Sequence, residues 1–280
     1  MKKYKVLSIP YMVWMGLFVL IPVVLIFIMA FQETQGVNIS QGTFTFGNLK
    51  YLANSTILKS FGRSVQFALI ATVICILLGY PVAYIMSRSI KLNRFLVMAI
   101  TILPMWSNTL LRTKVIGTLF QPGNILSDLL SKININLSLD IYGQPLAVII
   151  GLVATYLPFM ILPIYTVLEK IDNSLYDASH DLGANSVKTF LKVTVPMSLK
   201  GVTTGVILVF LPCATSFGVA EQLGDKSLIG SVINSYFSRV STYGIGSMIS
   251  LVILIVLTIS IFIIGKVDKE GETLLWWIKN

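Results

Sequence analysis

The chain has 280 residues, of which 55% are hydrophobic and only 12% charged. Soluble domains carry about 25% charged residues, so this composition excludes an ordinary soluble enzyme and indicates a surface that largely faces lipid. The net charge of +9 does not indicate nucleic-acid binding, because the Lys and Arg residues lie in short clusters between apolar runs.

The apolar runs predict an all-α membrane protein with six spanning helices in one transmembrane domain, residues 1–280. A helix needs roughly 20 apolar residues to cross a hydrocarbon core, and it must satisfy its own backbone hydrogen bonds there. The first run is too long for a signal peptide and has no small-residue cleavage site, so we interpret it as a retained span. The predicted spans are, in chain order, 9–31, 64–86, 95–111, 145–168, 202–222 and 243–265.

The distribution of basic residues predicts the orientation of these spans. If the N-terminus is cytoplasmic, 13 of the Lys and Arg residues lie in inside segments and 8 in outside segments. The turn SRSIKLNR between the second and third spans is the clearest single signal, because Lys and Arg concentrate in cytoplasmic loops. We therefore predict that both termini, and the loop 169–201, are cytoplasmic.

This predicted cytoplasmic loop is the most polar long stretch of the chain. Ser174, followed three residues later by Asp177, is typical of a helix start, and Gly183 predicts a left-handed helix end. Asn185 or Ser186 can cap a second short helix. The loop is therefore expected to be a helix–turn–helix that lies against the inner face of the membrane, with Pro196 opening the helix into the fifth span.

The same loop resembles the EAA signature of ATP-binding-cassette importer permeases. The matching positions are Asp177, Ala178, Ser179, Gly183 and the VTVP of residues 193–196. Asp177 and Ser179 stand where the family usually has Glu and Ala, and Val193 and Val195 where it has Ile and Leu. The resemblance implies a type I importer (MetI-like) bundle whose loop docks into a cleft of a separate ATPase. The residues that it assigns to this coupling are Asp177, Ala178, Ser179, His180, Gly183, Ala184 and Pro196.

Three further segments resemble the PotB-type spermidine/putrescine permeases of this family. These segments are LPMWSNTLLR (103–112), AVIIGLVATYLPFMILPIYTVLEKID (147–172) and SLIGSVI (227–233). The resemblance implies a bacterial cell-membrane subunit that works with a PotC-like second permease, a PotA-like ATPase dimer and a PotD-like extracytoplasmic binding protein. It also implies that ATP and Mg²⁺ are used by the partner ATPase and that this chain binds no cofactor. Permeases for iron, thiamine or sulfate share the loop, so these solutes remain alternatives to polyamines.

Polar and aromatic residues near the middle of the spans are candidates for a substrate path. From the helix rise, Trp106 lies about 16 Å into the third span, and Tyr156 reaches a similar depth in the fourth. Their rings can either attract an alkylammonium by cation–π contact or simply pack or face lipid. The predicted path residues are Trp106, Asn108, Tyr156, Thr215, Ser216 and Glu221.

Glu221 is the only acidic residue within a predicted span, and ionisable groups at such depths are functional candidates. It can receive a polyamine ammonium at the outer end of the fifth span. Alternatively it can form an ion pair with Arg112, which ends the third span on the same side. The two interpretations coexist if the pair opens during transport.

Other function classes explain the sequence less well. A secondary transporter or channel would require more intramembrane charge than Glu221 supplies, and it would leave the loop unexplained. An embedded enzyme or metal site would require a constellation that His180 alone cannot form, and Cys75 and Cys213 lie inside apolar runs as expected buried thiols. The GDKS of 224–227 lacks the glycine spacing of a phosphate loop, so ATP hydrolysis is expected in a partner.

Overall fold

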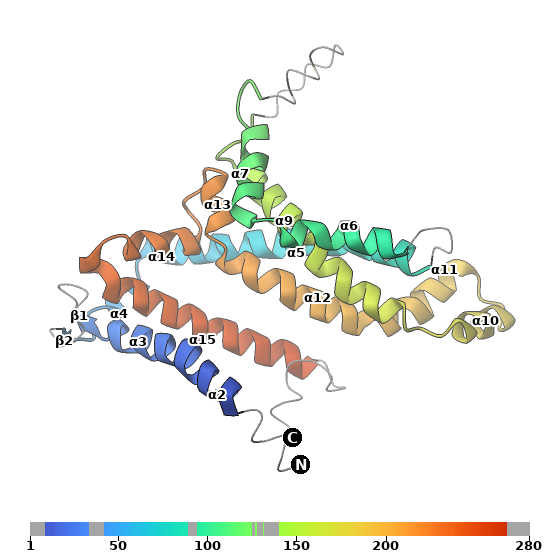
Figure 1. The fold of residues 1–280 in the computed structure, drawn as a ribbon, viewed down its shortest axis with the longest axis horizontal. Coiled ribbons are helices and arrows are strands. Elements are labelled where there is room, and N and C mark those ends of the chain that lie inside the picture. Colours follow the sequence, from blue (N-terminus) through green and yellow to red (C-terminus); the bar gives the residue numbers. More distant parts are fainter. Residues whose placement is uncertain are drawn as a thin grey trace. The chain divides into compact units, whose positions relative to one another are not determined.

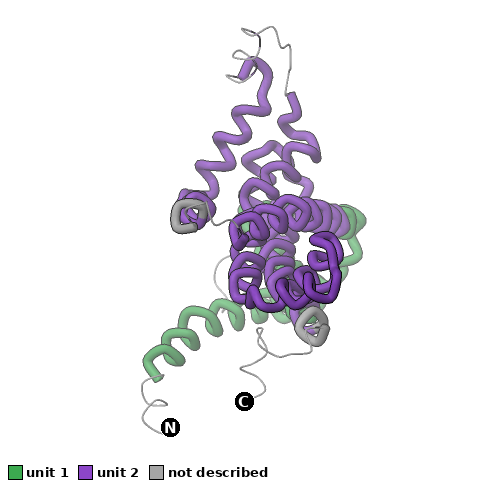
Figure 2. The backbone as a smooth tube through the Cα atoms, turned by 90° about the vertical axis from the view of Figure 1, so that its right-hand side faces the viewer, with its two compact units in different colours: residues 1–60, 232–259 green, residues 61–231, 260–280 purple. Residues whose placement is uncertain are grey.

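The computed structural model describes residues 9–33, 42–88, 94–124, 127, 131 and 140–267. Regular structure in these residues is helical apart from one short antiparallel pair, β1 (Gln32–Glu33) and β2 (Thr43–Phe44) (Figure 1). The chain divides into two compact units (Figure 2). Unit 1 comprises residues 1–60 and 232–259, and unit 2 comprises residues 61–231 and 260–280.

The predicted spans correspond to helices. Among the described residues, five helices are long and apolar enough to cross a membrane, and they match the first, second, fourth, fifth and sixth predicted spans. Their bounds are Ile9–Ala30, Ser55–Arg88, Pro145–Leu168, Ser186–Thr215 and Val240–Phe262. The protein is therefore an all-α, multi-pass membrane protein. Cys75 and Cys213 are buried free thiols, as predicted.

The third span differs from the continuous helix that its predicted range, 95–111, implies. α6 (Arg94–Trp106) ends after 13 residues, and α7 (Thr109–Leu119) begins as a separate helix. A helix of that length reaches only about 20 Å, which is shorter than a hydrocarbon core. The break arises because Asn108 has an extended backbone and its side chain accepts hydrogen bonds from the first amides of α7, so it acts as an N-cap.

The fifth span is also divided, within its predicted range of 202–222. α12 (Val195–Thr215) ends at Ser216, whose backbone is extended, and the short α13 (Gly218–Gln222) follows. The last residues assigned to the fifth span, including Glu221, therefore lie on a separate helix. Both breaks thus interrupt sequence runs for which the apolar pattern predicts continuous helices.

Pro196 lies in the first turn of α12, as the sequence predicts, but α12 continues a helix that has already begun. α11 (Ser186–Thr189) continues through the π-helical turn η3 (Phe190–Thr194) directly into α12, so the chain is helical from residue 186 onward. Proline lacks an N–H and its ring crowds the carbonyl four residues earlier. The wider π turn immediately before Pro196 accommodates the ring without ending the helix.

Helix α9 (Pro145–Leu168) is the centre of unit 2. It packs against α12, α6, α7 and α13, and its buried residues form a large part of the core. Two glycines allow α12 to approach it closely: a Cβ at Gly201 would lie 2.7 Å from the Pro163 carbonyl oxygen, and one at Gly205 would lie 2.6 Å from the Met160 sulfur. Small residues at such positions are typical of packed membrane helices.

Unit 1 contains both the first and the last span. Its elements are α2 (Ile9–Met15), the π-helical η1 (Gly16–Leu20), α3 (Ile21–Ala30), α4 (Leu49–Leu52), the start of α5 (Ser55–Arg88), most of α14 (Ile229–Phe237), η4 (Val240–Thr242) and most of α15 (Tyr243–Val267). The buried Asn48 amide donates hydrogen bonds to the carbonyls of Ala30 (2.9 Å) and Gln32 (3.0 Å). It thereby satisfies the Ala30 carbonyl, which the end of α3 leaves without a helical partner, and also contacts β1.

Candidate functional site

The polar loop forms helix α10 (Asn173–Asp181), and its first residue differs from the prediction. Asp172 is the N-cap, with its carboxylate accepting a hydrogen bond from the Ser174 amide at 3.0 Å. Hydrogen bonds from the Ser174 backbone and hydroxyl lower the pKa of the Asp172 carboxyl. Ser174 is therefore the donor rather than the cap, and Asp177, predicted to cap, lies inside the helix.

The end of α10 is the left-handed turn that the sequence predicts. Gly183 has a φ of 75°, its amide donates to the His180 carbonyl at 2.8 Å, and the Ala184 amide donates to the Ser179 carbonyl at 3.0 Å. This pair of bonds is a Schellman motif, which glycine favours because it lacks a Cβ. Asn185, rather than Ser186, caps the following α11 by accepting from the Lys188 amide at 2.9 Å.

One buried hydrogen bond holds α10 against α11. The Ser179 and Thr189 hydroxyl oxygens lie 2.6 Å apart, and both side chains are buried. Ser179 is therefore turned toward this contact and does not face outward. The other predicted coupling residues are exposed or half-buried, and they are Asp177, Ala178, His180, Gly183, Ala184 and Pro196.

Apolar side chains are also exposed in the turn after α10, in α11 and in η3. Leu182 is 88% exposed, and Val187 and Leu191 are also exposed. Apolar side chains gathered on an otherwise polar, protruding segment are typical of a surface that a partner covers. We call residues 173–189, which comprise α10, its glycine turn and α11, the coupling pair.

A second polar group forms where the divided spans meet α9. The carbonyl of Pro104, near the end of α6, accepts hydrogen bonds from the Ser107 hydroxyl at 2.8 Å and from the Arg112 guanidinium, which also contacts the Ser107 hydroxyl at 3.2 Å. The Tyr156 phenol of α9 interacts with the Ser216 hydroxyl and lies within electrostatic range of Arg112. We call these five residues the broken-helix cluster.

The broken-helix cluster lies where two helices predicted to span the membrane are interrupted. Irregular backbone at membrane depth is tolerated only where protein buries it or where it lines a cavity. Many transporters use interrupted helices in this way, because the interruption exposes backbone and hydroxyl groups to a solute. The cluster offers a half-buried aromatic ring, two hydroxyls and one guanidinium.

The structure brings some of the predicted path residues together and separates others. Tyr156 and Ser216 belong to the broken-helix cluster, whereas Asn108 caps α7 and the Thr215 hydroxyl donates to a carbonyl one turn earlier at 3.1 Å. Trp106 is 85% exposed and points away from the core. It borders an apolar groove of about 270 Å³ on α6, lined also by Met98, Ala99, Ile102 and Leu103.

The expected ion pair between Arg112 and Glu221 is not formed. The guanidinium of Arg112 is directed to Pro104 and Ser107, because the end of α6 leaves a carbonyl that needs a donor. Glu221 is half-buried on α13. In the part of the chain that the structure describes, the ion pair lies elsewhere, between Arg63 and Asp225.

This Arg63–Asp225 pair is a feature that sequence reasoning missed. One Asp225 carboxylate oxygen lies 3.3 Å from Arg63, and the other accepts hydrogen bonds from the Ser227 amide (2.8 Å) and hydroxyl (2.6 Å). Nearby, the Ser64 hydroxyl accepts from the Ile229 amide at 2.8 Å. The Asp-x-Ser spacing is a turn signal visible in the sequence, but the distant partners on α5 are not.

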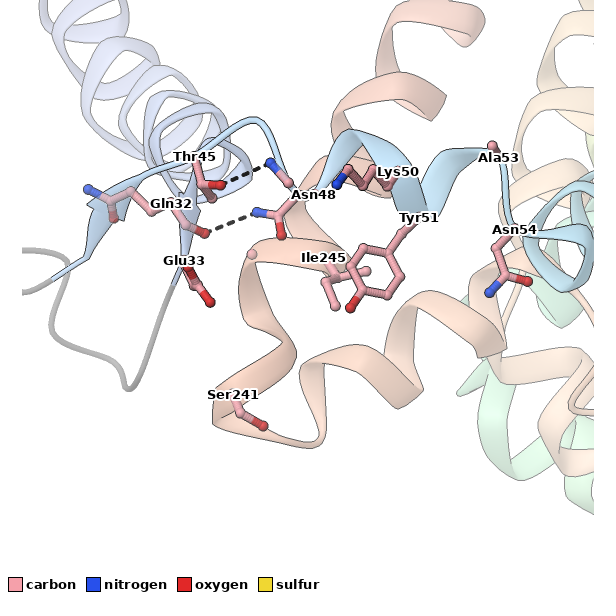
Figure 3. Close-up of a pocket in the computed structure, with 12 residues that line it drawn as sticks. Gln32, Glu33, Thr45, Asn48, Lys50, Tyr51, Ala53, Asn54, Ser241 and Ile245 are labelled. Atoms are coloured by element: carbon pink, nitrogen blue, oxygen red, sulfur yellow. Dashed lines mark hydrogen bonds between the residues drawn. The ribbon is translucent and has the colours of Figure 1, made fainter.

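Unit 1 contains a polar pocket of about 550 Å³ that includes none of the predicted site residues. As Figure 3 shows, the Asn48 amide is directed at Gln32, and Tyr51, Ser241 and Ile245 line another side. Within the described residues, no group of three or more His, Cys, Asp or Glu side chains is placed to hold a metal ion.

The chain is similar to known transport proteins. Residues 75–269 match the family described as binding-protein-dependent transport system inner membrane component. The chain is 36% identical over 259 residues to the spermidine/putrescine transport system permease protein PotB of Haemophilus influenzae, covering 91% of both chains. It is 31% identical to PotB of Escherichia coli K12, over 91% of this chain and 94% of that one.

Solved structures agree on the fold. A bacterial ABC transporter chain involved in alginate import superposes with a TM-score of 0.69 at 15% identity, covering 96% of both chains. The same transporter in complex with a periplasmic protein that carries an alginate pentasaccharide gives the same TM-score. At this identity the likeness concerns the fold.

Proposed function

Because the chain belongs to the family of binding-protein-dependent transport system inner membrane components, we propose that it is the polyamine-path permease of an ATP-binding-cassette importer. In this proposal a PotD-like protein delivers spermidine or putrescine to this chain and a PotC-like second permease. A PotA-like ATPase dimer supplies the energy and holds the ATP and Mg²⁺, while this subunit binds no nucleotide. The chain ends are cytoplasmic, on the same side as the coupling pair.

The observation that carries the coupling role is the coupling pair itself. Each of its two helices has a side-chain N-cap, the Ser179–Thr189 hydrogen bond fastens the helices to each other, and the Leu182 side chain between them is almost fully exposed. Such a rigid, protruding pair loses little conformational entropy when it docks into a cleft. Closure of the ATPase dimer would then favour one conformation of the permeases through differential binding.

Polyamine as the substrate class is supported by the two PotB relatives and by the chemistry of the broken-helix cluster. An aromatic ring and hydroxyl oxygens are groups that bind an alkylammonium ion. Arg112 carries a positive charge that would repel a polycation, but it already donates to the Pro104 carbonyl and the Ser107 hydroxyl.

Arg112 also supports a second candidate, an importer of an anionic solute such as sulfate. In that case the guanidinium would turn from Pro104 toward the solute and pair with it directly. The two candidates predict opposite effects of removing the charge: neutralising Arg112 would leave polyamine import intact or raise it, but it would abolish import of an anion.

The decisive experiment is reconstitution of the chain with its second permease, ATPase and binding protein in liposomes. We expect ATP hydrolysis to rise when the binding protein is loaded with spermidine or putrescine, and to stay at the basal rate with thiamine, iron or sulfate. Leu182→Asp should prevent co-purification of the ATPase, because a charge would be buried at the contact. Leu199→Asp, at an exposed position outside the coupling pair, is the matched control.

Stimulation by sulfate instead of polyamines would establish the second candidate. Co-purification that is unaffected by Leu182→Asp would contradict the docking role of the coupling pair.

A further inference from the structure

Three side chains on one face of α5 contact the coupling pair and the helix that follows it. Tyr80, Tyr84 and Arg88 are spaced four residues apart, so they form a single stripe along the helix. The coupling assignment from the EAA signature does not involve any of them. We call them the α5 stripe.

Arg88 holds α10 at two points. Its guanidinium lies over the Tyr176 ring, with 3.3 Å between the guanidinium carbon and the ring centroid, and it donates a hydrogen bond to the Asn173 side-chain oxygen at 3.0 Å. Asn173 and Tyr176 are three residues apart, on one face of the first turns of α10. A planar guanidinium can stack and donate simultaneously, which a lysine ammonium cannot do with the same geometry.

The two tyrosines of the stripe hold the helix beyond α11. The Tyr84 and Tyr80 rings meet the Phe190 ring of η3 edge to face, with centroid distances of 5.3 and 5.8 Å. The Tyr80 hydroxyl lies 2.7 Å from the Ser198 hydroxyl of α12. One face of α5 is therefore joined to α10, to η3 and to the beginning of α12.

We propose that Arg88 is a positioning residue that transmits movement of α10 to α5. The inference rests on the proposed function, since it requires that an ATPase moves the coupling pair. A helix anchored at a single point can pivot when it is pushed, whereas α10 is held by Arg88 on one face and by the Ser179–Thr189 bond on another. When α10 is displaced, it therefore moves α5 with it instead of only rotating in place.

The test measures polyamine molecules imported per ATP hydrolysed by the complete transporter in liposomes. We expect Arg88→Ala and Tyr176→Leu each to lower this ratio about fivefold, the factor expected for loss of one half-buried cation–π contact. Stimulated hydrolysis itself should persist, because the exposed docking residues are unchanged. The double variant should be no worse than Arg88→Ala, since Tyr176→Leu removes one of the two contacts that Arg88→Ala removes.

Tyr176→Phe is the matched control. The Tyr176 hydroxyl is buried without a hydrogen-bond partner among the described residues, so removing it leaves the ring under Arg88 and should leave the ratio at the wild-type value. Lys170→Ala removes an exposed charge from the same loop and should also have no effect.

The outcomes separate the inference from its premise. If import and hydrolysis fall in proportion, or if the ratio is unchanged in Arg88→Ala and Tyr176→Leu, Arg88 does not transmit movement and the proposal is overturned. If Arg88→Ala fails to assemble, Tyr176→Leu against Tyr176→Phe decides the question alone. If wild-type transporter shows no hydrolysis in response to loaded binding protein, the proposed function itself fails.

Discussion

The coupling pair and the broken-helix cluster, both in unit 2, are built in different ways. The coupling pair is held mostly by bonds between residues close in sequence: a cap from Asp172, a glycine turn at Gly183 and one hydroxyl pair. The broken-helix cluster combines groups from α6, α7, α9 and α12. The difference indicates that the first region can move as a preformed piece, whereas changes in the second disturb the packing of the whole unit.

The largest expected effect is at the ion pair between the partly exposed Arg63 and the buried Asp225, which ties α5 to the segment after α13. Asp225→Ala should lower the free energy of unfolding by about 3 kcal/mol, because it removes the buried carboxylate that accepts two hydrogen bonds from Ser227 and pairs with Arg63. Asp225→Asn should lower the free energy of unfolding by less, since the asparagine side-chain oxygen can still accept hydrogen bonds from Ser227. Thermal denaturation of the purified protein in detergent measures this. Asp140→Ala, at an exposed position, should change nothing.

Neutralising Arg112 should have the next largest effect on stability. Arg112→Met leaves the Pro104 carbonyl without its guanidinium donor, at a cost of about 2 kcal/mol. Arg112→Lys should cost less stability than Arg112→Met, because the lysine ammonium can still donate a hydrogen bond to the Pro104 carbonyl. The same denaturation assay applies, with Lys114→Met on the exposed face of α7 as control. Equal stability of the Met and Lys variants would show that the carbonyl does not need this donor.

The contact between α9 and α12 connects these two regions and should discriminate between two glycines. Gly201→Ala should cost about 1–2 kcal/mol, because the new Cβ would meet backbone atoms of Pro163 and Ile164 that cannot move independently. Gly205→Ala should cost less, since it meets the flexible end of Met160. The thermal denaturation midpoints of the two variants measure this difference, and each variant serves as the control for the other. A larger loss of stability in Gly205→Ala than in Gly201→Ala would contradict the packing described for α9.

The smallest effect concerns the cap of the coupling pair. Because hydrogen bonds lower the pKa of folded Asp172, its contribution is complete above the ordinary carboxyl pKa of about 3.9 and is lost as the pH falls through the lower folded value. Protection of the Ser174 amide from hydrogen exchange should therefore be constant from about pH 5 to pH 8. Asp172→Asn should keep this protection at acidic pH, whereas Asp172→Ala should lose it at every pH.

Much of the coupling pair could be predicted from the sequence. The Gly183 turn and the second cap followed from residue type alone, because the groups that form them lie within a few residues of one another. The sequence prediction placed the start of α10 at Ser174, whereas the N-cap is Asp172. Both residue types are good N-caps, and the choice between them depends on where the preceding helix ends. The positions of the first, fourth and sixth spans followed from apolar length, which the membrane thickness fixes.

The sequence by itself determined the membrane class, the spans and the family signature, because lipid and local hydrogen bonding act on short stretches of chain regardless of what they pack against. Only the tertiary structure decided which polar groups meet. Arg112 donates a hydrogen bond to Pro104 instead of pairing with Glu221. Arg63 pairs with Asp225, and Arg88 contacts α10. In an apolar interior each buried donor or charge takes the partner that helix packing brings within reach, and that packing joins residues that are far apart in the chain.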